Sequence, residues 1–466
     1  MKTHTTFHTT AKTFLTLAAA SLLSVAAFSA PPTPPITLRI ELDRSVLPAD
    51  TTDRAIVKVA IDGRRLPRAE ARPPVNLCIV LDRSGSMQGE KLEQAKRAAI
   101  EALNHLGEGD IFSLVIFDDK IETLFPGTRI DKAGTRNVIE SYIRQITARG
   151  STALFGGLSQ GAAEIRKYIE NSGYSHRIIL LSDGKANVGP DFAADFGRLG
   201  AALMKEGISV TTVGLGLGYD EDIMTRLALK SDGNTYFVED ARDLARIFDA
   251  ELGDVLNIVA RRAVVTIEFP EGVRPIRFVG REGSIRGQNA ELTLNQIYGG
   301  QEKFALIEVE TPRARAGTER EIARAQVVFE DALANKSASL DATSRARFSD
   351  DKSVVIKSGN SAVQTNYAEN RFAEAKDKAV ALADAGKTAE AAQAIQDEVV
   401  QMSAFSVSTG NAAVGKLATD NRADAAKIAT EGIGNADRKN YRAQFNATVT
   451  QQSSSGTSSF ISSGTK

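Results

Sequence analysis

Three short segments carry oxygen-bearing side chains at the ends of predicted elements. Asp82-Arg83-Ser84-Gly85-Ser86 directly follows an apolar run at residues 77–81, and Ser182-Asp183-Gly184 ends a second run at 178–181. Gly150-Ser151-Thr152 opens a predicted helix. Ligands of open α/β sheets bind outside the carboxyl ends of the strands, so we expect the three segments to meet at one edge. The candidate site residues are Asp82, Ser84, Ser86, Thr152 and Asp183.

These side chains offer hydroxyl and carboxylate oxygens, with no nitrogen or sulfur. Such a set favours a hard cation over Zn²⁺, and the hard cations in question are Mg²⁺, Mn²⁺ and Ca²⁺. We expect Mg²⁺, because few charged ligands and retained waters suit its octahedral shell. The alternative is that the hydroxyls only cap helices: Ser86 could cap the helix that follows it, and Thr152 the next one.

A doubly wound α/β domain is predicted to position the candidate site. Strand-like apolar runs alternate with helical patterns of apolar residues from about residue 75 onward, which is typical of a parallel sheet covered by helices. The first of these runs is apolar at every position, as in a strand that is buried on both faces. The predicted strands lie at residues 77–81, 111–117, 178–181, 208–213 and 235–238.

Rows of alternating apolar and polar residues lie on both sides of this domain. They occur at 36–42 and 55–61, and again after about residue 260, and period two is typical of antiparallel strands over a core. Because two strands are not stable alone, we predict one β-sandwich built from both sets. The predicted organisation is a signal peptide over 1–27, sandwich strands over 28–71, the inserted α/β domain over 72–258, further sandwich strands over 259–332, a linker over 333–365, a helical region over 366–450, and a disordered tail over 451–466.

Within the helical region, the pattern predicts a hairpin of two helices with its turn at Gly386. Residues 410–450 are rich in Ala, Asn and Gly and are predicted to be only weakly helical.

The amino-terminal segment is predicted to direct export. Lys2 and Lys12 precede an apolar run at 14–28 that is too short to cross a bilayer. Small residues favour cleavage after Ala27, with cleavage after Ala30 or an uncleaved anchor as alternatives. No later segment is apolar enough to span a membrane, so we expect a periplasmic or secreted protein without a transmembrane segment in its mature chain.

Composition excludes several other classes of protein. A length of 466 residues predicts two or three domains, and a net charge of −1 argues against a nucleic-acid binder. The single cysteine, Cys78, rules out an intramolecular disulfide and a cysteine zinc cluster. Outside the predicted signal peptide, the histidines are His105 and His176, and the latter is expected to face solvent. No activating base is identifiable beside a serine, and no Gly-x-Ser-x-Gly motif is present, so we expect no enzyme.

Two further loops follow predicted strands at the expected site edge, and we interpret neither as part of the site. Asp118 and Asp119 follow a predicted strand, and we interpret them as a solvated loop rather than as carboxylates that support the metal ligands. The Gly214-x-Gly216-x-Gly218 segment lacks the later glycine of a dinucleotide fingerprint. It is interpreted as a tight strand-to-helix turn.

Asp82-x-Ser84-x-Ser86, Thr152 and Asp183 resemble the metal-ion-dependent adhesion site of von Willebrand factor A domains. The resemblance covers residues 75–257, and the wording of residues 80–87 is particularly similar to exported bacterial members. The layout with flanking strands is also similar to the inter-α-trypsin-inhibitor heavy-chain and calcium-activated-chloride-channel-like bacterial proteins. The resemblance implies a Rossmann-like fold.

The resemblance also implies roles for the five residues. Ser84, Ser86 and Thr152 would bind the metal through their hydroxyls, while Asp82 and Asp183 would act directly or through water. A carboxylate from a partner protein would fill the sixth position. We therefore expect an exported, metal-dependent adhesion or scaffold module that captures an acidic residue of its partner. The alternatives are a structural envelope protein whose metal only stabilises the domain and, less favoured, a hydrolase.

Overall fold

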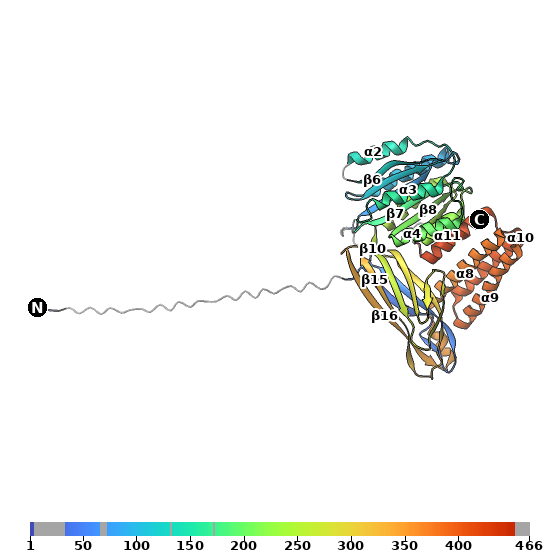
Figure 1. Ribbon diagram of the computed structural model, residues 1–466. Coiled ribbons are helices and arrows are strands. Elements are labelled where there is room, and N and C mark those ends of the chain that lie inside the picture. Colours follow the sequence, from blue (N-terminus) through green and yellow to red (C-terminus); the bar gives the residue numbers. More distant parts are fainter. Residues whose placement is uncertain (4–32, 66–71, 131–132, 171–172, 453–466) are drawn as a thin grey trace. The chain divides into compact units, whose positions relative to one another are not determined.

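The computed structural model describes residues 1–3, 33–65, 72–130, 133–170 and 173–452. The chain divides into two compact units, residues 1–34 and 35–466, and all described helices and strands lie in the second (Figure 1). Most of the predicted signal peptide and residues 453–466 of the predicted tail lie outside the described residues. Among the described residues, no helix combines the length and the apolarity needed to cross a membrane.

The α/β domain is built on one six-stranded sheet in the order β6-β5-β4-β7-β8-β9. All neighbouring strands are parallel except β5 and β6. The central strands are buried at every position because helices cover both faces, which explains their continuous apolar sequences. The strands are β4 (Val75–Asp82), β5 (Ile111–Phe117), β6 (Ile121–Arg129), β7 (Ser175–Ser182), β8 (Ile208–Leu215) and β9 (Thr235–Val238).

Two hydrophobic cores flank this sheet. One core contains side chains of α1 (Glu90–His105), α2 (Ala133–Arg144) and α6 (Leu244–Val255). The other contains side chains of α3 (Leu154–Arg166), α4 (Ala193–Lys205) and α5 (Glu221–Lys230), and Cys78 is buried in it as an unpaired thiol. The predicted doubly wound, Rossmann-like architecture is therefore confirmed.

The β-sandwich combines strands from both sides of the α/β domain. One sheet has the order β1-β3-β14-β11, and the other has the order β12-β13-β10-β15-β16-β2. Strand β3 pairs along its length with β14, which closes the sandwich around the insertion and confirms that the α/β domain is inserted. The strands are β1 (Ile36–Leu42), β2 (Val46–Pro48), β3 (Asp53–Gly63), β10 (Ile258–Glu268), β11 (Arg274–Val279), β12 (Ser284–Arg286), β13 (Asn289–Tyr298), β14 (Glu302–Thr311), β15 (Glu319–Asp331) and β16 (Lys336–Ser349).

The prediction of a linker over 333–365 is wrong. This segment contains β16, the short helix α7 (Lys352–Lys357) and the start of α8 (Ser361–Asp384). Strand β16 alternates, but its inward positions are mostly Ala, Ser and Leu, so the row is weakly apolar. Its pairing with β15 along nearly its whole length supplies the stability that its own sequence does not signal.

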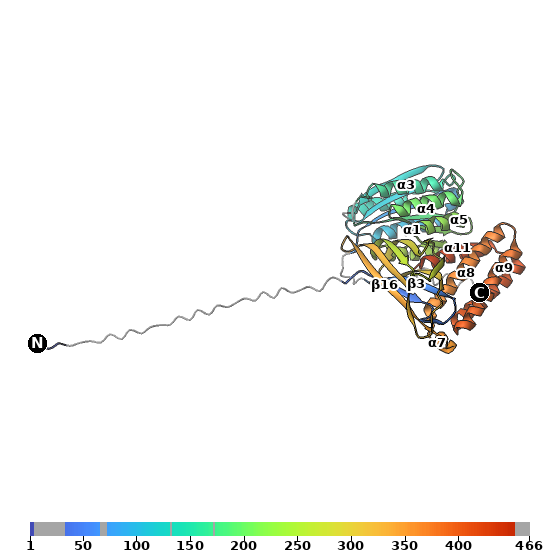
Figure 2. The same cartoon turned by 60° about the horizontal axis from the view of Figure 1, so that its bottom comes forward.

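The helical region begins earlier, and is more regular, than predicted. It consists of α8, α9 (Thr388–Thr409), α10 (Ala412–Glu431) and α11 (Asn435–Thr450). Helices α8 and α9 form the predicted hairpin, with Gly386 at φ +76° in the turn, and lie side by side in both views (Figure 1, Figure 2). The stretch predicted to be weakly helical forms two full helices, because Asn411 caps α10 and packing covers its small residues.

This helical region packs against the first sandwich sheet. Phe304 and Leu306 of β14 share a core with Phe372 of α8 and Ile395 of α9. Helix α11 packs against α8 and also contacts α5 and β9 of the α/β domain. The carboxyl-terminal helices are therefore attached both to the sandwich and to the inserted domain.

His176 lies in β7 with only 6% of its surface exposed, so the expectation that it faces solvent is wrong. Burial, followed by the charges of Arg261 and Arg262, lowers the pKa of His176 to about 4. Both arginines belong to β10 of the sandwich. The sequence of β7 gives no indication that β10 lies beside it.

We expect His176 to make the folded chain sensitive to acid. Its pKa is about 4 when folded and about 6.5 when unfolded, so the unfolded chain binds the extra proton between these values. Stability from this group is present above pH 6.5 and lost as pH falls toward 4, by about 3 kcal/mol. The free energy of unfolding, measured by urea denaturation from pH 7 to pH 4, should fall less steeply in His176→Gln. Equal slopes in the two proteins would contradict this assignment.

Candidate metal centre

All five candidate residues lie at the carboxyl edge of the α/β sheet. Asp82 is the last residue of β4, and Asp183 directly follows β7. Ser84 and Ser86 lie in the turn and short 3-10 helix between β4 and α1, and Thr152 lies just before α3. Because β4 pairs with both β5 and β7, the three segments converge as predicted.

A chain of hydrogen bonds joins the hydroxyls to the two carboxylates. Ser86 Oγ donates to Asp183 Oδ1 at 2.7 Å, and Ser84 Oγ lies 3.1 Å from Ser86 Oγ. Asp82 Oδ1 accepts from the Ser84 backbone N–H at 2.7 Å, and Asp82 Oδ2 accepts from the Ser182 hydroxyl. Burial raises the pKa of Asp82 to about 6, against the opposing effect of these donors. The two carboxylates thus orient the loop that carries the serine hydroxyls.

Hydrogen bonds of its backbone hold Thr152 beside the serine hydroxyls. Its N–H donates to Asn187 Oδ1 at 2.7 Å, and its carbonyl accepts from the Asn187 N–H at 3.1 Å. At Gly184, a Cβ atom would lie 3.0 Å from Thr152 Oγ1 and 3.6 Å from Ser86 Oγ. The glycine therefore leaves open the space that these two hydroxyls border.

The interpretation of the hydroxyls as helix caps is not supported. The N-cap residue of α1 is Gly89 and that of α3 is Ala153, and neither helix has a side-chain capping bond. Ser84 precedes the short 3-10 helix, where it also makes no side-chain capping bond. Helix capping therefore does not explain the positions of Ser84, Ser86 and Thr152.

The donor set fits a hard divalent cation. Hydroxyl and carboxylate oxygens gather around the space left by Gly184, and these are the donors that Mg²⁺, Mn²⁺ and Ca²⁺ take in proteins. Neither here nor elsewhere does the described part of the chain contain a group of three or more His, Cys, Asp or Glu side chains placed to hold a metal, so the candidate depends on hydroxyls beside two carboxylates.

Asp118 supports this edge and was misinterpreted from the sequence. We expected a solvated loop, but its side chain is buried and pairs with Arg83 at 2.8 Å and Arg149 at 2.9 Å. Although burial raises the pKa of Asp118, the Lys120 N–H and these two guanidinium groups lower it below its usual value overall. Asp118 therefore ties together the loops that carry the serines and Thr152.

Lys91 and Asn187 also contact the site, and sequence reasoning missed both. Lys91 Nζ, from the first turn of α1, binds Asp183 Oδ2, so each oxygen of Asp183 has a partner. Asn187 holds Thr152, as described above. Their proximity to the two segments in sequence was the available signal, but only the folded chain shows which way these side chains point.

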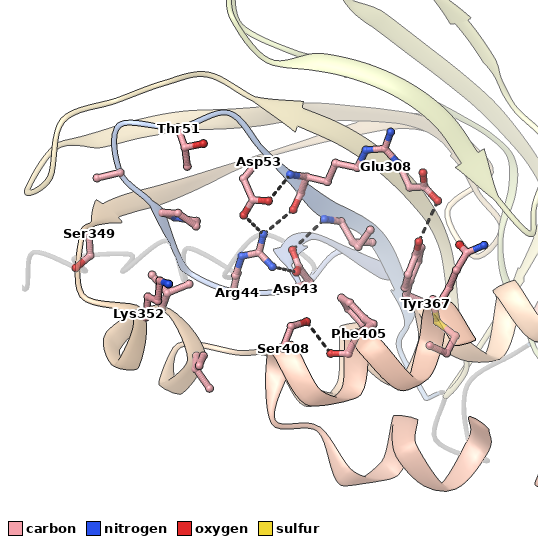
Figure 3. A pocket seen from close by; sticks show the side chains of 18 of the residues that line it. Asp43, Arg44, Thr51, Asp53, Glu308, Ser349, Lys352, Tyr367, Phe405 and Ser408 are labelled. Carbon is pink, nitrogen blue, oxygen red and sulfur yellow. Dashed lines mark hydrogen bonds and ion pairs between the residues drawn. The ribbon is translucent and has the colours of Figure 1, made fainter. Parts of the chain in front are cut away.

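A second candidate is a cavity of about 770 Å³ where the sandwich meets α7, α8 and α9 (Figure 3). On one side, Arg44 pairs with Asp43 at 3.0 Å and Asp53 at 2.7 Å. On the other, Tyr367 donates to Glu308 at 3.1 Å. Much of the charge in the cavity is therefore already paired within the chain.

This cavity lacks the groups for nucleophilic catalysis. The described residues that line it include neither His nor Cys. The hydroxyl of Ser408 donates to the Phe405 carbonyl at 2.9 Å (Figure 3), that of Thr51 donates to the Thr52 carbonyl at 3.1 Å, and that of Ser349 accepts from the Asp351 N–H at 3.1 Å. Since these three hydroxyls bond to backbone rather than to a base, we favour the carboxyl edge of the sheet as the functional site.

Comparison with known proteins identifies the domain that carries this edge. Residues 76–250 match the von Willebrand factor type A domain. Over 272 residues the chain is 27% identical to an uncharacterized protein of Synechocystis. The aligned region covers 56% of this chain and 63% of that protein. It is also 27% identical over 201 residues to pig inter-alpha-trypsin inhibitor heavy chain H1, spanning 42% of this chain and 22% of that one. The chain thus covers less than two thirds of these relatives.

Two solved structures share the fold more broadly. A von Willebrand factor type A protein from Catenulispora acidiphila superposes with a TM-score of 0.62 at 18% identity, covering 79% of this chain and 89% of that one. The ArnB paralog VWA2 from Sulfolobus acidocaldarius gives a TM-score of 0.57 at 18% identity, covering 89% and 98%. At this identity the likeness concerns the fold alone.

Proposed function

We propose that this chain, which carries a von Willebrand factor type A domain over residues 76–250, binds an acidic residue of a partner protein through a divalent cation. Domains of this type generally mediate protein–protein interaction, often in a metal-dependent way. The observation that carries the proposal is a cluster of three hydroxyls. Those of Ser86 and Thr152 border the space left by Gly184, and that of Ser84 lies 3.1 Å from that of Ser86.

In the proposed site, the hydroxyls of Ser84, Ser86 and Thr152 would hold the cation. Asp183 accepts the hydrogen bond of Ser86 and so directs the lone pairs of that hydroxyl away from itself. Asp82 fixes the Ser84 backbone and supplies buried negative charge. A bound cation would offer an open coordination position, and a carboxylate oxygen of the partner could occupy it.

The acidic nature of the partner follows from charge. Neutral hydroxyl ligands leave a divalent cation only partly neutralised, and Lys91 already offsets the charge of Asp183. A further carboxylate therefore gains a charge-assisted contact at this edge. Mg²⁺ is the proposed cation because it keeps several waters that such a carboxylate can displace.

We propose binding without turnover. The serine hydroxyls contact each other and Asp183 instead of a base. His176 lies near the start of β7, whereas Asp183 follows the end of that strand, and His105 ends α1. Among the described residues, neither histidine is therefore placed to activate Ser84 or Ser86. A purely structural metal is the competing function, and it predicts no partner.

We also propose that the protein is exported and then acts in the periplasm or outside the cell. The support is the sequence of residues 1–27, with its lysines, apolar run and small residues before the proposed cleavage point. Mass spectrometry of the protein purified from cell fractions would give the mature amino terminus, and an uncut Met1 in a cytoplasmic fraction would oppose export.

The test of the proposed function uses the mature chain as bait for cell-envelope extract. Capture is expected in Mg²⁺, and loss of the captured protein is expected in EDTA and with the double variant Ser84→Ala, Ser86→Ala. Asp191→Ala is the control, because Asp191 is an exposed carboxylate in the segment between β7 and α4. Capture that survives EDTA and the double variant would reject the metal-dependent mode, and a metal-dependent melting temperature without capture would favour the structural role.

A further inference from the structure

Three bulky apolar side chains are exposed at the proposed metal edge. Their exposed fractions are 37% for Val188, 72% for Phe192 and 47% for Leu217. Val188 and Phe192 lie between β7 and α4, and Leu217 lies between β8 and α5. Both segments follow parallel strands, so they lie at the same edge of the sheet as Asp183.

Contacts place Leu217 and Val188 on two sides of the site. Leu217 stands between two glycines: a Cβ at Gly216 would lie 3.9 Å from Lys91 Nζ, and one at Gly218 would lie 2.7 Å from the Asp183 carbonyl oxygen. Val188 directly follows Asn187, which binds the Thr152 backbone. Each apolar residue is thus one position away from a residue that touches the metal loops.

Phe192 occupies a position where local stability favours another residue type. It is the N-cap residue of α4, and it makes no side-chain capping bond. Ser, Thr, Asp and Asn are preferred there because their side chains accept a hydrogen bond from the first turn. A largely exposed phenylalanine therefore contributes neither a cap nor core packing, which points to a role outside the folded chain.

The charges around these apolar side chains are of both signs. Lys91 reaches Asp183, and Lys185 is exposed in the loop that follows β7. Asp191 is exposed directly before Phe192. Selection for an acidic ligand therefore comes from the proposed metal site, while the exposed apolar side chains beside it complement bulky apolar groups of the same segment.

We propose that this surface recognises a partner segment in which an Asp or Glu is flanked, within a few positions, by a bulky apolar residue. The carboxylate is directed to the hydroxyl cluster, a step that rests on the proposed function. Phe192, Val188 and Leu217 take the neighbouring apolar side chain. The apolar surface is continuous with the proposed metal site, which takes a carboxylate, so the occupant is a partner segment rather than a bilayer.

The test selects a random heptapeptide library, displayed on phage, against the immobilised mature chain in Mg²⁺ and elutes with EDTA. We expect enrichment of Asp or Glu with an adjacent Leu, Ile or Phe. For one enriched peptide, Phe192→Ser should weaken binding about tenfold, as removal of one buried aromatic contact predicts. Because serine is a favoured N-cap residue, this variant should keep or raise the melting temperature. Val138→Ser is the control, since Val138 is an exposed apolar residue on α2.

The outcomes separate this inference from the proposed function. Enrichment of acidic residues without apolar neighbours, or unchanged affinity in Phe192→Ser, overturns the apolar contact and leaves the metal-dependent mode standing. Failure to select acidic peptides, or binding that resists EDTA, rejects the metal-dependent mode itself. Self-association in sedimentation experiments that disappears in Phe192→Ser would assign the surface to a second copy of this chain, and would also overturn the inference.

Discussion

Asp82→Ala is expected to reduce the affinity for Mg²⁺ by at least about 100-fold while the chain remains folded. Asp82 is fully buried at the end of β4, where it fixes the Ser84 backbone and accepts the Ser182 hydroxyl. Its removal takes away both the negative charge and the alignment of the serine loop. Burial raises the pKa of Asp82 because desolvation disfavours its charged form, so removing the carboxylate relieves that cost and offsets part of the hydrogen bonds that are lost.

Calorimetric titration of the EDTA-treated chain with MgCl₂ measures this effect, and circular dichroism checks the fold. Asp82→Asn keeps the shape of the side chain and isolates the contribution of charge. Asp191→Ala, on the exposed loop before α4, should bind Mg²⁺ like the parent chain. If Asp82→Ala bound Mg²⁺ with unchanged affinity, the cation would have to lie elsewhere in the molecule.

Lys439→Met is expected to destabilise the chain by about 3 kcal/mol. Lys439 lies on α11 with 1% of its side chain exposed, and its Nζ donates to Glu221 Oε2 at 2.5 Å and to the Tyr219 carbonyl at 2.8 Å. The ammonium group also lies 4.3 Å from the centroid of the Tyr219 ring. Among the described residues, Arg438 at 3.0 Å is then the only ion-pair partner left to the largely buried Glu221. A buried charge that loses its closer partner is costly, which explains the size of the effect.

Urea denaturation of the full mature chain gives the free energy of unfolding. Lys427→Met is the matched control on α10, because the Lys427–Asp437 pair is largely exposed and should contribute less than about 1 kcal/mol. The double variant Lys439→Met, Glu221→Gln should lose less than the sum of the single changes, since the buried charge is then absent. A loss equal to that of the control would mean that α11 does not depend on this pair.

The position of the site could be read from the sequence because it depends on a single rule. The carboxyl ends of parallel strands share one edge, and continuous apolar runs identified those strands. Asp82 and Asp183 follow their strands directly, so counting along the chain sufficed for them. The structure brings the five residues together as predicted, and their binding of a cation stays a prediction.

The residues that support the site escaped prediction because their roles depend on contacts distant in sequence. Asp118 looks like an ordinary loop residue until Arg83 and Arg149 are placed around it. Away from the site, His176 looks exposed until β10 brings Arg261 and Arg262 beside it. A single sequence carries the pattern of an element but not the identity of the neighbours that cover it.

The missed strand β16 and the underestimated helix α10 have a related cause. Both are rich in small or polar residues, so their periodicity is weak when apolar side chains alone are counted. Pairing with β15 stabilises β16, and packing in the helical core stabilises α10. In such segments tertiary contacts, rather than local propensity, decide the structure.

The contacts of α11 have a consequence for the order in which the molecule is completed. Asn435 Nδ2 donates to the Leu217 carbonyl at 3.1 Å, and Lys439 binds the Tyr219 carbonyl from a position 220 residues later in the chain. The loop beside Asp183 therefore obtains these partners only after the chain has been synthesised past residue 439 and α11 has docked. Contacts of such long sequence separation form slowly, so a nascent or truncated chain can complete its sheet while one wall of its binding edge is still unsupported.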